Sequence, residues 1–246
     1  MKCALGDLTT AELFQILGAS SREALRGTIS SKANALKNIK ASVQATYARY
    51  KREGVKEALK HDTQSAQDFV TSLPAKGRAM YYHFQSLSRD KQIEQVAVFI
   101  LTLSIFFAAG GGFDFEGGIP DLDIVVGGIG AHRSIFTHTI IIGFGFEFAA
   151  RFGIQVLGKI RDRLPRVHHQ AWDRVYEFID SHQNLFIGAL WAGIGAHLIK
   201  DTGLLVGGVK PYVELPNGLP IAVHQTLFGA NAAACELFAF HDARNH

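Results

Sequence analysis

Two pairs of residues in the second half of the chain have the spacing of metal ligands. Asp121 and Asp123 are separated by one residue, so in an extended segment both carboxylates would project to the same side. His197 and Asp201 have the i, i+4 spacing that places two side chains on one face of a helix. Each pair could therefore supply two ligands to a divalent cation.

Two histidines between these pairs, His132 and His138, could add imidazole nitrogens. Mixed imidazole and carboxylate ligation suits Zn²⁺ best, with Mn²⁺ or Fe²⁺ as alternatives, whereas Ca²⁺ would want oxygen ligands almost throughout. Six ligands exceed one tetrahedral site, so they predict either two metals or one metal with further carboxylates that orient the histidines. The predicted metal ligands are Asp121, Asp123, His132, His138, His197 and Asp201.

Three residues are candidates for catalysis of hydrolysis at such a centre: Asp123, Arg133 and His224. Asp123 is counted both as a ligand and as a catalytic carboxylate. Arg133 could bind a phosphate or carboxylate group of a substrate, or else anchor the chain to lipid phosphates. His224 could act as a general acid or a further ligand, or could be a buried structural histidine.

The elements that must position these residues change character along the chain. Residues 1–93 carry 15 of the 25 Lys and Arg residues and lack the alternation typical of strands. Beyond them lie four stretches almost free of charge, and a helix of about 19 residues reaches roughly 28 Å, close to the thickness of a bilayer core. These stretches are 95–113, 135–158, 181–199 and 215–235. We therefore predict an all-α protein, with a soluble helical domain over residues 1–93 and a four-helix transmembrane bundle over residues 94–246.

Residues 1–93 carry several helix signals. Residues 9–12 and 20–23 both fit the capping-box pattern and predict helix starts. This domain is a candidate for binding a cytoplasmic ligand or protein, or for self-association alone. Its long helix is expected to bury the apolar side chains of Leu25, Ile29, Leu36, Ile39, Val43 and Tyr47.

The distribution of basic residues predicts the orientation in the membrane. Fifteen Lys and Arg residues precede the first apolar stretch, one lies in residues 114–134, and six lie in residues 151–174. The positive-inside rule then places the N-terminus and the C-terminus in the cytoplasm. All three groups of candidate ligands come to lie at the outer boundary of the membrane.

Composition excludes several classes of protein. The net charge of +3 is too small to indicate nucleic-acid binding. With only two cysteines, the chain can form neither a disulfide framework nor a zinc module of four cysteines. The expected partners are membrane lipid and further copies of the chain, in addition to the cytoplasmic ligand or protein that residues 1–93 are candidates to bind.

The ligand segments also resemble a known family. A Pro-Asp-x-Asp element ends at Asp123, a His-Arg element is followed by Thr-His-Thr, and a His-Leu-x-x-Asp element ends at Asp201. This series resembles the bacterial inner-membrane proteins classed as membrane-bound, metal-dependent hydrolases of the YdjM-like type. The resemblance covers about residues 95–240, although three residues here separate Arg133 from Thr137, more than in the family's tight form. It implies a metal-dependent hydrolase, and the position at the membrane boundary suggests a lipid-linked phosphoester as substrate.

Two other functions fit parts of the same pattern. A homo-oligomeric, ligand-gated pore, for example a phage-defence effector, could use Glu147 and Glu236 to line its path and the His/Asp groups as a structural metal site. A soluble all-helical metal protein could instead pack its apolar segments internally. Ion flux that survives His197→Ala would favour the pore, and extraction from membranes by high salt alone would favour the soluble protein.

Overall fold

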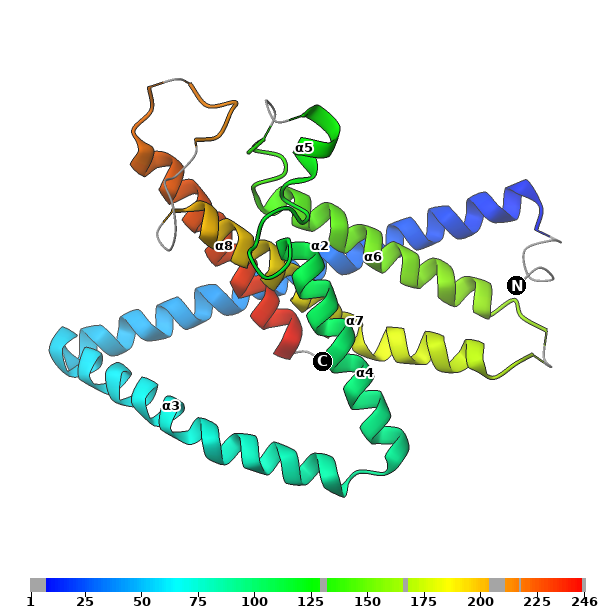
Figure 1. Cartoon of the computed structure of the whole chain (residues 1–246), viewed down its shortest axis with the longest axis horizontal. Helices are drawn as coiled ribbons and strands as arrows, with labels where there is room; N and C mark the ends of the chain where they lie inside the picture. The colour runs from blue at the N-terminus through cyan, green and yellow to red at the C-terminus, as the bar shows by residue number, and fades with distance from the viewer. Residues whose placement is uncertain (1–7, 129–131, 166–167, 204–210, 217, 245–246) are drawn as a thin grey trace. The chain divides into compact units, whose positions relative to one another are not determined.

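The computed structural model describes residues 8–128, 132–165, 168–203, 211–216 and 218–244. Within these residues the chain forms seven α-helices and no β-strand, which confirms the predicted all-α class (Figure 1). In chain order the helices are α2 (Thr10–Glu53), α3 (Val55–Ser86), α4 (Arg89–Gly110), α5 (Leu122–Gly127), α6 (Ile140–Arg161), α7 (Ala171–Asp201) and α8 (Ile221–Arg244).

Local sequence signals account for several helix ends. The backbone N–H of Glu12 donates to Thr9 Oγ1 at 3.3 Å, and the backbone N–H of Thr9 donates to Glu12 Oε2 at 2.9 Å, so the first predicted capping box starts α2. The second predicted start, over residues 20–23, is wrong, because these residues lie inside α2 and continue its backbone hydrogen bonding. Gly54, with φ of 84°, separates α2 from α3.

The helices belong to two compact units, and the predicted boundary between residues 93 and 94 does not coincide with them. One unit, the core unit, contains the described residues up to Ala35 together with those from Leu101 onward. The other, the hairpin unit, contains Leu36–Ile100. The first part of α2, up to Ala35, therefore belongs to the same unit as α5, α6, α7 and α8, and not with the rest of residues 1–93.

The core unit is centred on α7, which packs against α6 and α8. The Trp191 ring of α7 is fully buried and lies 5.5 Å from the Phe144 ring of α6 and 5.1 Å from the Phe238 ring of α8. Edge-to-face contacts at these distances stabilise a core beyond the area that they bury. The result is a helical bundle with the predicted ligands gathered at one end.

The face of α2 that packs in the core unit differs from the predicted one. Leu25, Ile29 and Leu36 are more than half exposed, whereas Ser20, Ala24, Thr28, Lys32 and Ala35 are buried. Small side chains let two helices approach closely, and charged groups of neighbouring helices hold the buried lysine. The prediction that α2 buries its large apolar side chains is therefore wrong for these three residues, and also for Val43 and Tyr47 farther along the helix, which are exposed.

Two helices in the described part of the chain are long and apolar enough to cross a membrane, α4 and α6. The helices α7, with 31 residues, and α8, with 24, overlap the third and fourth predicted stretches and are long enough, but they are not apolar enough to count as candidate spans. In the second half of α7, glycine and histidine stand among the apolar residues and lower its mean hydropathy. The fold therefore includes two candidate membrane spans where the sequence predicts four.

Candidate metal centre

The ligand-bearing segments meet where α4 and α7 end and the chain enters α6. Between α4 and α5 the chain folds back on itself, and the backbone N–H of Ile119 donates to the carbonyl of Ala109 at 3.0 Å. Gly118 makes this close approach possible, since its φ is 77° and a Cβ atom there would lie only 2.5 Å from the nitrogen of Gly111. The fold-back places Asp121 beside the last turn of α4, and its Oδ2 accepts a hydrogen bond from the N–H of Gly117 at 2.7 Å.

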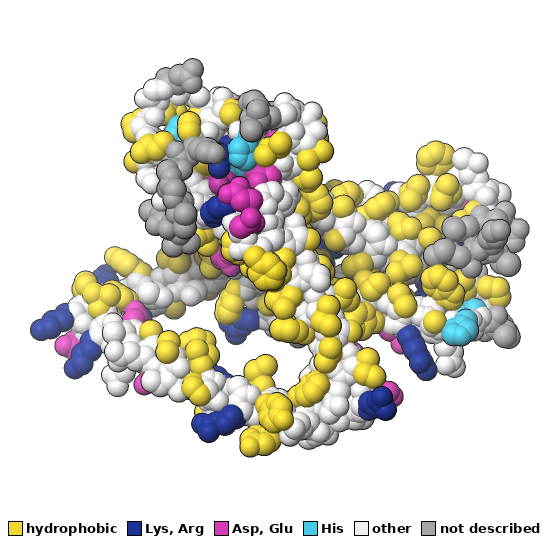
Figure 2. Space-filling view, viewed as in Figure 1, with side chains coloured by type: hydrophobic (Ala, Val, Ile, Leu, Met, Phe, Trp, Pro, Cys, Tyr) yellow, Lys and Arg dark blue, Asp and Glu magenta, His cyan; other side chains and the backbone are white. Residues whose placement is uncertain are grey.

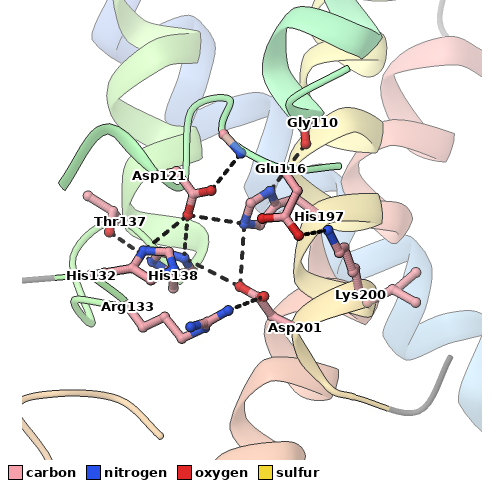
Figure 3. Close-up of polar contacts among 12 residues, drawn as sticks. Gly110, Glu116, Asp121, His132, Arg133, Thr137, His138, His197, Lys200 and Asp201 are labelled. Carbon is pink, nitrogen blue, oxygen red and sulfur yellow. Dashed lines mark hydrogen bonds and ion pairs between the residues drawn. The ribbon is translucent and has the colours of Figure 1, made fainter. Parts of the chain in front are cut away.

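One atom from each of four predicted ligands forms a closed ring of contacts (Figure 3). Asp121 Oδ1 lies 3.3 Å from His138 Nε2 and 3.5 Å from His197 Nε2. Asp201 Oδ2 lies 3.4 Å and 3.3 Å from the same two nitrogens. Ligands about 2.0–2.1 Å from one tetrahedral zinc ion are separated by roughly 3.3–3.4 Å, so these distances suit ligands of a shared cation.

The other two predicted ligands extend this ring on one side. His132 Nδ1 lies 3.3 Å from Asp121 Oδ1 and 3.5 Å from Asp123 Oδ1. Two groups thus have the spacing to hold an ion, one of Asp121, His138 and His197 and one of Asp123, His132 and His138. The structure therefore brings all six predicted ligands together, in an arrangement compatible with one or two metals.

The strongest local sign of a cation site is a group of buried polar atoms without hydrogen-bond partners in the described part of the chain. Each of the six residues has one buried nitrogen or oxygen atom that makes no hydrogen bond within the described part of the chain. Buried polar atoms normally have partners, because an unmade hydrogen bond costs about 1–3 kcal/mol. The atoms are Asp121 Oδ1, Asp123 Oδ1, His132 Nδ1, His138 Nε2, His197 Nε2 and Asp201 Oδ2. A divalent cation would satisfy carboxylate oxygens and neutral imidazole nitrogens together, so the residues fit a metal.

The remaining atoms of these residues are held in place by neighbours. His197 Nδ1 donates to the carbonyl of Gly110 at 3.1 Å, so Nε2 is the ring nitrogen that faces Asp121 and Asp201. Burial opposes protonation of this imidazole, but the two carboxylates raise its pKa to about 9, so a metal bound at Nε2 would displace a proton. Asp123 Oδ2 accepts hydrogen bonds from Thr137 Oγ1 at 2.7 Å and from the N–H of Ser134 at 3.0 Å. Partners of this kind orient metal ligands and are a usual part of metal sites.

Electrostatics keep two of the carboxylates in the form that binds a metal. Burial by itself opposes ionisation of Asp121, but contacts with His138 and His197 hold the pKa of this carboxyl far below its usual range. Burial also opposes ionisation of Asp201, whose pKa is nevertheless lowered by His197 and Arg133. Both side chains are thus charged at neutral pH.

Arg133 contacts a predicted ligand. Its Nη2 donates to Asp201 Oδ1 at 3.0 Å, and its side chain is 12% exposed. The residue has a φ of 70°, a conformation that non-glycine residues seldom adopt. Its Nε is buried and makes no hydrogen bond to any described residue. That N–H could serve an anionic oxygen of a substrate.

His224 is buried, and its contacts are with Tyr212 rather than with the six ligands in the described part of the chain. Its Nδ1 accepts a hydrogen bond from the N–H of Tyr212 at 3.1 Å. The Tyr212 hydroxyl in turn donates to the backbone carbonyl of His138 at 2.8 Å, and its ring stacks on Phe228 at 4.2 Å. Sequence reasoning missed Tyr212, because nothing in its spacing links it to residue 138.

Tyr212→Phe is expected to weaken metal binding while leaving the fold intact. The change removes one hydrogen bond to the segment that carries His138 but keeps the stacked ring. Loss of an outer partner of a metal ligand typically costs about 10–100-fold in metal affinity. Zinc titration against a competing chelator measures this effect, and Tyr82→Phe in the hairpin unit, at an exposed position, is the matched control. An unchanged affinity in Tyr212→Phe would show that Tyr212 does not position His138.

Comparison of the chain with protein-family models, with curated proteins and with solved structures found no match.

Proposed function

We propose that this protein is an integral-membrane, metal-dependent hydrolase of the YdjM-like type. The observation that carries the proposal is the convergence of six buried nitrogen and oxygen atoms without hydrogen-bond partners in the described part of the chain. Carboxylates and neutral imidazoles gathered in this way are the ligands of zinc and related divalent ions in hydrolytic centres. Zn²⁺ is the proposed metal, with Mn²⁺ or Fe²⁺ as alternatives.

Each residue of this centre would have a distinct role. Asp121, His138, His197 and Asp201 would hold the ion, with His132 and Asp123 as further ligands or as partners of a second ion. When bound, a divalent ion supplies a Lewis acid for a phosphoryl or carbonyl oxygen and makes water a better nucleophile. Arg133 would keep Asp201 in place through Nη2 and offer Nε–H to an anionic oxygen of the substrate. His224 would support Tyr212 and, through it, the segment of His138.

The proposed setting is the bacterial inner membrane, with both termini in the cytoplasm and the metal centre at the outer face. Two helices with the length and hydropathy of membrane spans support this setting, as does the distribution of basic residues. The centre lies at the C-terminal end of one of these helices, α4, and just before the other, α6. A substrate at this level would be an ester whose head group lies at the membrane surface, such as a lipid-linked phosphoester.

The contacts of Glu147 favour the hydrolase over the pore. This carboxylate is fully buried and is bonded to Arg151, Trp191 and Lys32, so it is engaged in the bundle core. A group that lines a water-filled path would instead be solvated. In liposomes the purified protein is expected to give no ion flux. Flux that survives His197→Ala would favour the pore over the hydrolase.

Hydrolysis of a soluble phosphodiester by the detergent-purified, full-length protein tests the proposal. With bis(4-nitrophenyl) phosphate and added Zn²⁺, the wild-type protein is expected to release nitrophenol, and a chelator is expected to stop the reaction. His197→Ala should lower the rate at least about 100-fold, because it removes a group that would hold the ion. His83→Ala, at an exposed histidine of α3, is the control. Turnover that persists in His197→Ala, or a metal-loaded wild type with no turnover, would contradict the hydrolase.

Self-association is proposed for the hairpin unit. Along α3, Leu59, Thr63, Ala66, Val70, Leu73, Gly77 and Met80 follow one another at alternating intervals of four and three residues. This is the spacing of a coiled-coil seam, and Leu59, Val70, Leu73 and Met80 are each about half exposed or more. A second copy of α3 is the proposed partner. Leu73→Glu with Met80→Glu should shift the detergent-corrected mass to the monomer, whereas an unchanged mass would exclude this seam.

A further inference from the structure

A groove with a volume of about 460 Å³ lies between α4, α7 and α8 in the core unit. Cavities of roughly 300–1,000 Å³ are the usual size of small-molecule sites. The groove opens to the surface, because two of the residues around it, Leu103 of α4 and Phe240 of α8, are 39% and 62% exposed. Hydrophobic side chains of α4 are also visible on the surface in Figure 2. A small molecule can therefore enter the groove from outside the bundle.

Small residues of α7 and α8 leave the space that the groove occupies. Gly188, Ala189 and Ala192 line it on α7, and Ala239 and Ala243 line it on α8. The two helices are in close contact along the groove, since a Cβ atom on Gly188 would lie 3.0 Å from the Ala239 carbonyl oxygen. A large side chain at one of these positions would fill the space.

Among the described residues that line the groove, Glu236 of α8 alone carries a charge. Its Oε1 lies against Gly195 of α7, because a Cβ atom on that glycine would be 2.6 Å from it. The carboxylate is partly buried, and no hydrogen bond or ion pair joins it to a described residue. Arg244 of the same helix instead has its guanidinium over the Phe240 ring, 5.4 Å from the ring centre. Partial removal of a carboxylate from water without a partner costs free energy, and a cation bound beside Glu236 would offset that cost.

The walls of the groove suit an organic cation better than a metal ion. Metal ions such as Zn²⁺ and Ca²⁺ take about four or more ligands, whereas the described walls offer one carboxylate among mostly apolar side chains. The rings of Phe106 and Phe240 line the groove, and aromatic rings attract organic cations. The α7 residues of the groove extend from Leu185 to Ala192, or roughly 10 Å along the helix axis. Glu236 lies toward the Ala192 end, so a matching ligand would have one positive group and a hydrocarbon body.

We propose that this groove is a binding site for a lipophilic organic cation, an ammonium or phosphonium group on an aromatic or alkyl body. The positive group would lie beside the Glu236 carboxylate, and the body would lie among the apolar walls and the phenylalanine rings. The site is separate from the metal centre, because the α4 and α7 backbones are in contact between the two. At that contact a Cβ atom on Gly193 would lie 2.3 Å from the Phe106 carbonyl oxygen. The inference therefore goes beyond the proposed hydrolysis and does not depend on it.

Binding of tritiated tetraphenylphosphonium to the full-length protein in a non-ionic detergent tests the inference without requiring turnover. The wild type is expected to bind about one cation per chain and to become saturated. Tetraphenylborate has nearly the same size and shape but the opposite charge, so it should bind at least about tenfold more weakly. Equal binding of the two ions would overturn the proposal, because the groove would then select apolar bulk rather than charge. The absence of saturable binding of the cation would overturn it as well.

Variants locate the bound cation and identify the charge that holds it. Glu236→Gln keeps the size of the side chain and should lower the affinity for tetraphenylphosphonium at least about tenfold. Ala192→Trp fills the groove and should do the same, as should Leu103→Trp, which starts from a partly exposed position. Glu57→Gln, at an exposed glutamate of α3, is the matched control and should bind like the wild type. Wild-type affinity in Glu236→Gln, or in both tryptophan variants, would refute the site.

Discussion

Asp121→Asn is expected to abolish stoichiometric metal binding. Asp121 Oδ1 is the one carboxylate oxygen that lies within 3.5 Å of three of the imidazole rings in the site, those of His132, His138 and His197. Asparagine keeps the size of the side chain and the acceptor for the Gly117 N–H, but it lacks the negative charge that a divalent ion requires. We expect zinc affinity to fall at least about 100-fold, more than for the loss of an outer partner.

Elemental analysis of the detergent-purified protein measures this effect and also counts the metals. The wild type is expected to retain one or two zinc ions per chain after gel filtration, and Asp121→Asn none. In a centre of two ions, Asp123→Asn should lower the count from two to one. In a centre of one ion, it should leave the count at one and weaken affinity by about 10–100-fold.

Thermal unfolding gives an independent measurement of the same site. An ion at 100 times its dissociation constant stabilises the folded state by about 2.7 kcal/mol, so added zinc should raise the Tm of the wild type. The Tm of Asp121→Asn should not respond. Asp114→Asn, in the same loop and exposed, is the matched control and should respond like the wild type. A wild-type protein that neither retains zinc nor responds to it would remove the metal centre.

Lys32→Met is expected to destabilise the core unit by about 3–5 kcal/mol, the usual cost of breaking a buried ion pair by removing one partner. The Lys32 side chain is 3% exposed, and its ammonium lies 2.8 Å from Glu147 Oε2 and also contacts the Asp242 carboxylate. It lies 5.0 Å from the centre of the Trp191 ring. Without the lysine, two buried carboxylates would remain, of which Asp242 would keep only the Ser31 hydroxyl as a partner in the described chain.

A double variant distinguishes charge from packing in this cluster. Lys32→Met combined with Asp242→Asn removes one charge of each sign, so it should recover much of the stability lost in Lys32→Met. Lys37→Met, on an exposed turn of the same helix, should change the stability by no more than about 0.5 kcal/mol. Thermal unfolding in detergent compares the three variants. Equal stability of Lys32→Met and Lys37→Met would show that the ion pairs contribute nothing.

The candidate site was predictable from sequence to an unusual extent. The i, i+4 spacing of His197 and Asp201 follows from helix geometry, and the structure points both side chains into the site. The expected extended segment at Asp121 and Asp123 is wrong, because Asp121 is the N-cap of α5 and Asp123 lies in its first turn. Their carboxylates nevertheless converge on His132 Nδ1. A metal site needs a few residues of particular types, so the sequence pattern that predicts it involves few positions. The hydrogen bond of His197 to the Gly110 carbonyl and the support from Tyr212 join segments far apart in sequence, and no local pattern records them.

The sequence by itself determined the all-α class, the first capping box and the set of six candidate ligands, because periodicity, caps and ligand chemistry act over a few neighbouring residues. Only the tertiary structure decided which face of α2 is buried and which charges pair inside the bundle. Lys32 is one of many basic residues in the polar part of the chain, and its burial depends on Glu147 and Asp242, which lie more than 100 residues away. Such pairings are set by how helices pack, and no single helix contains the information.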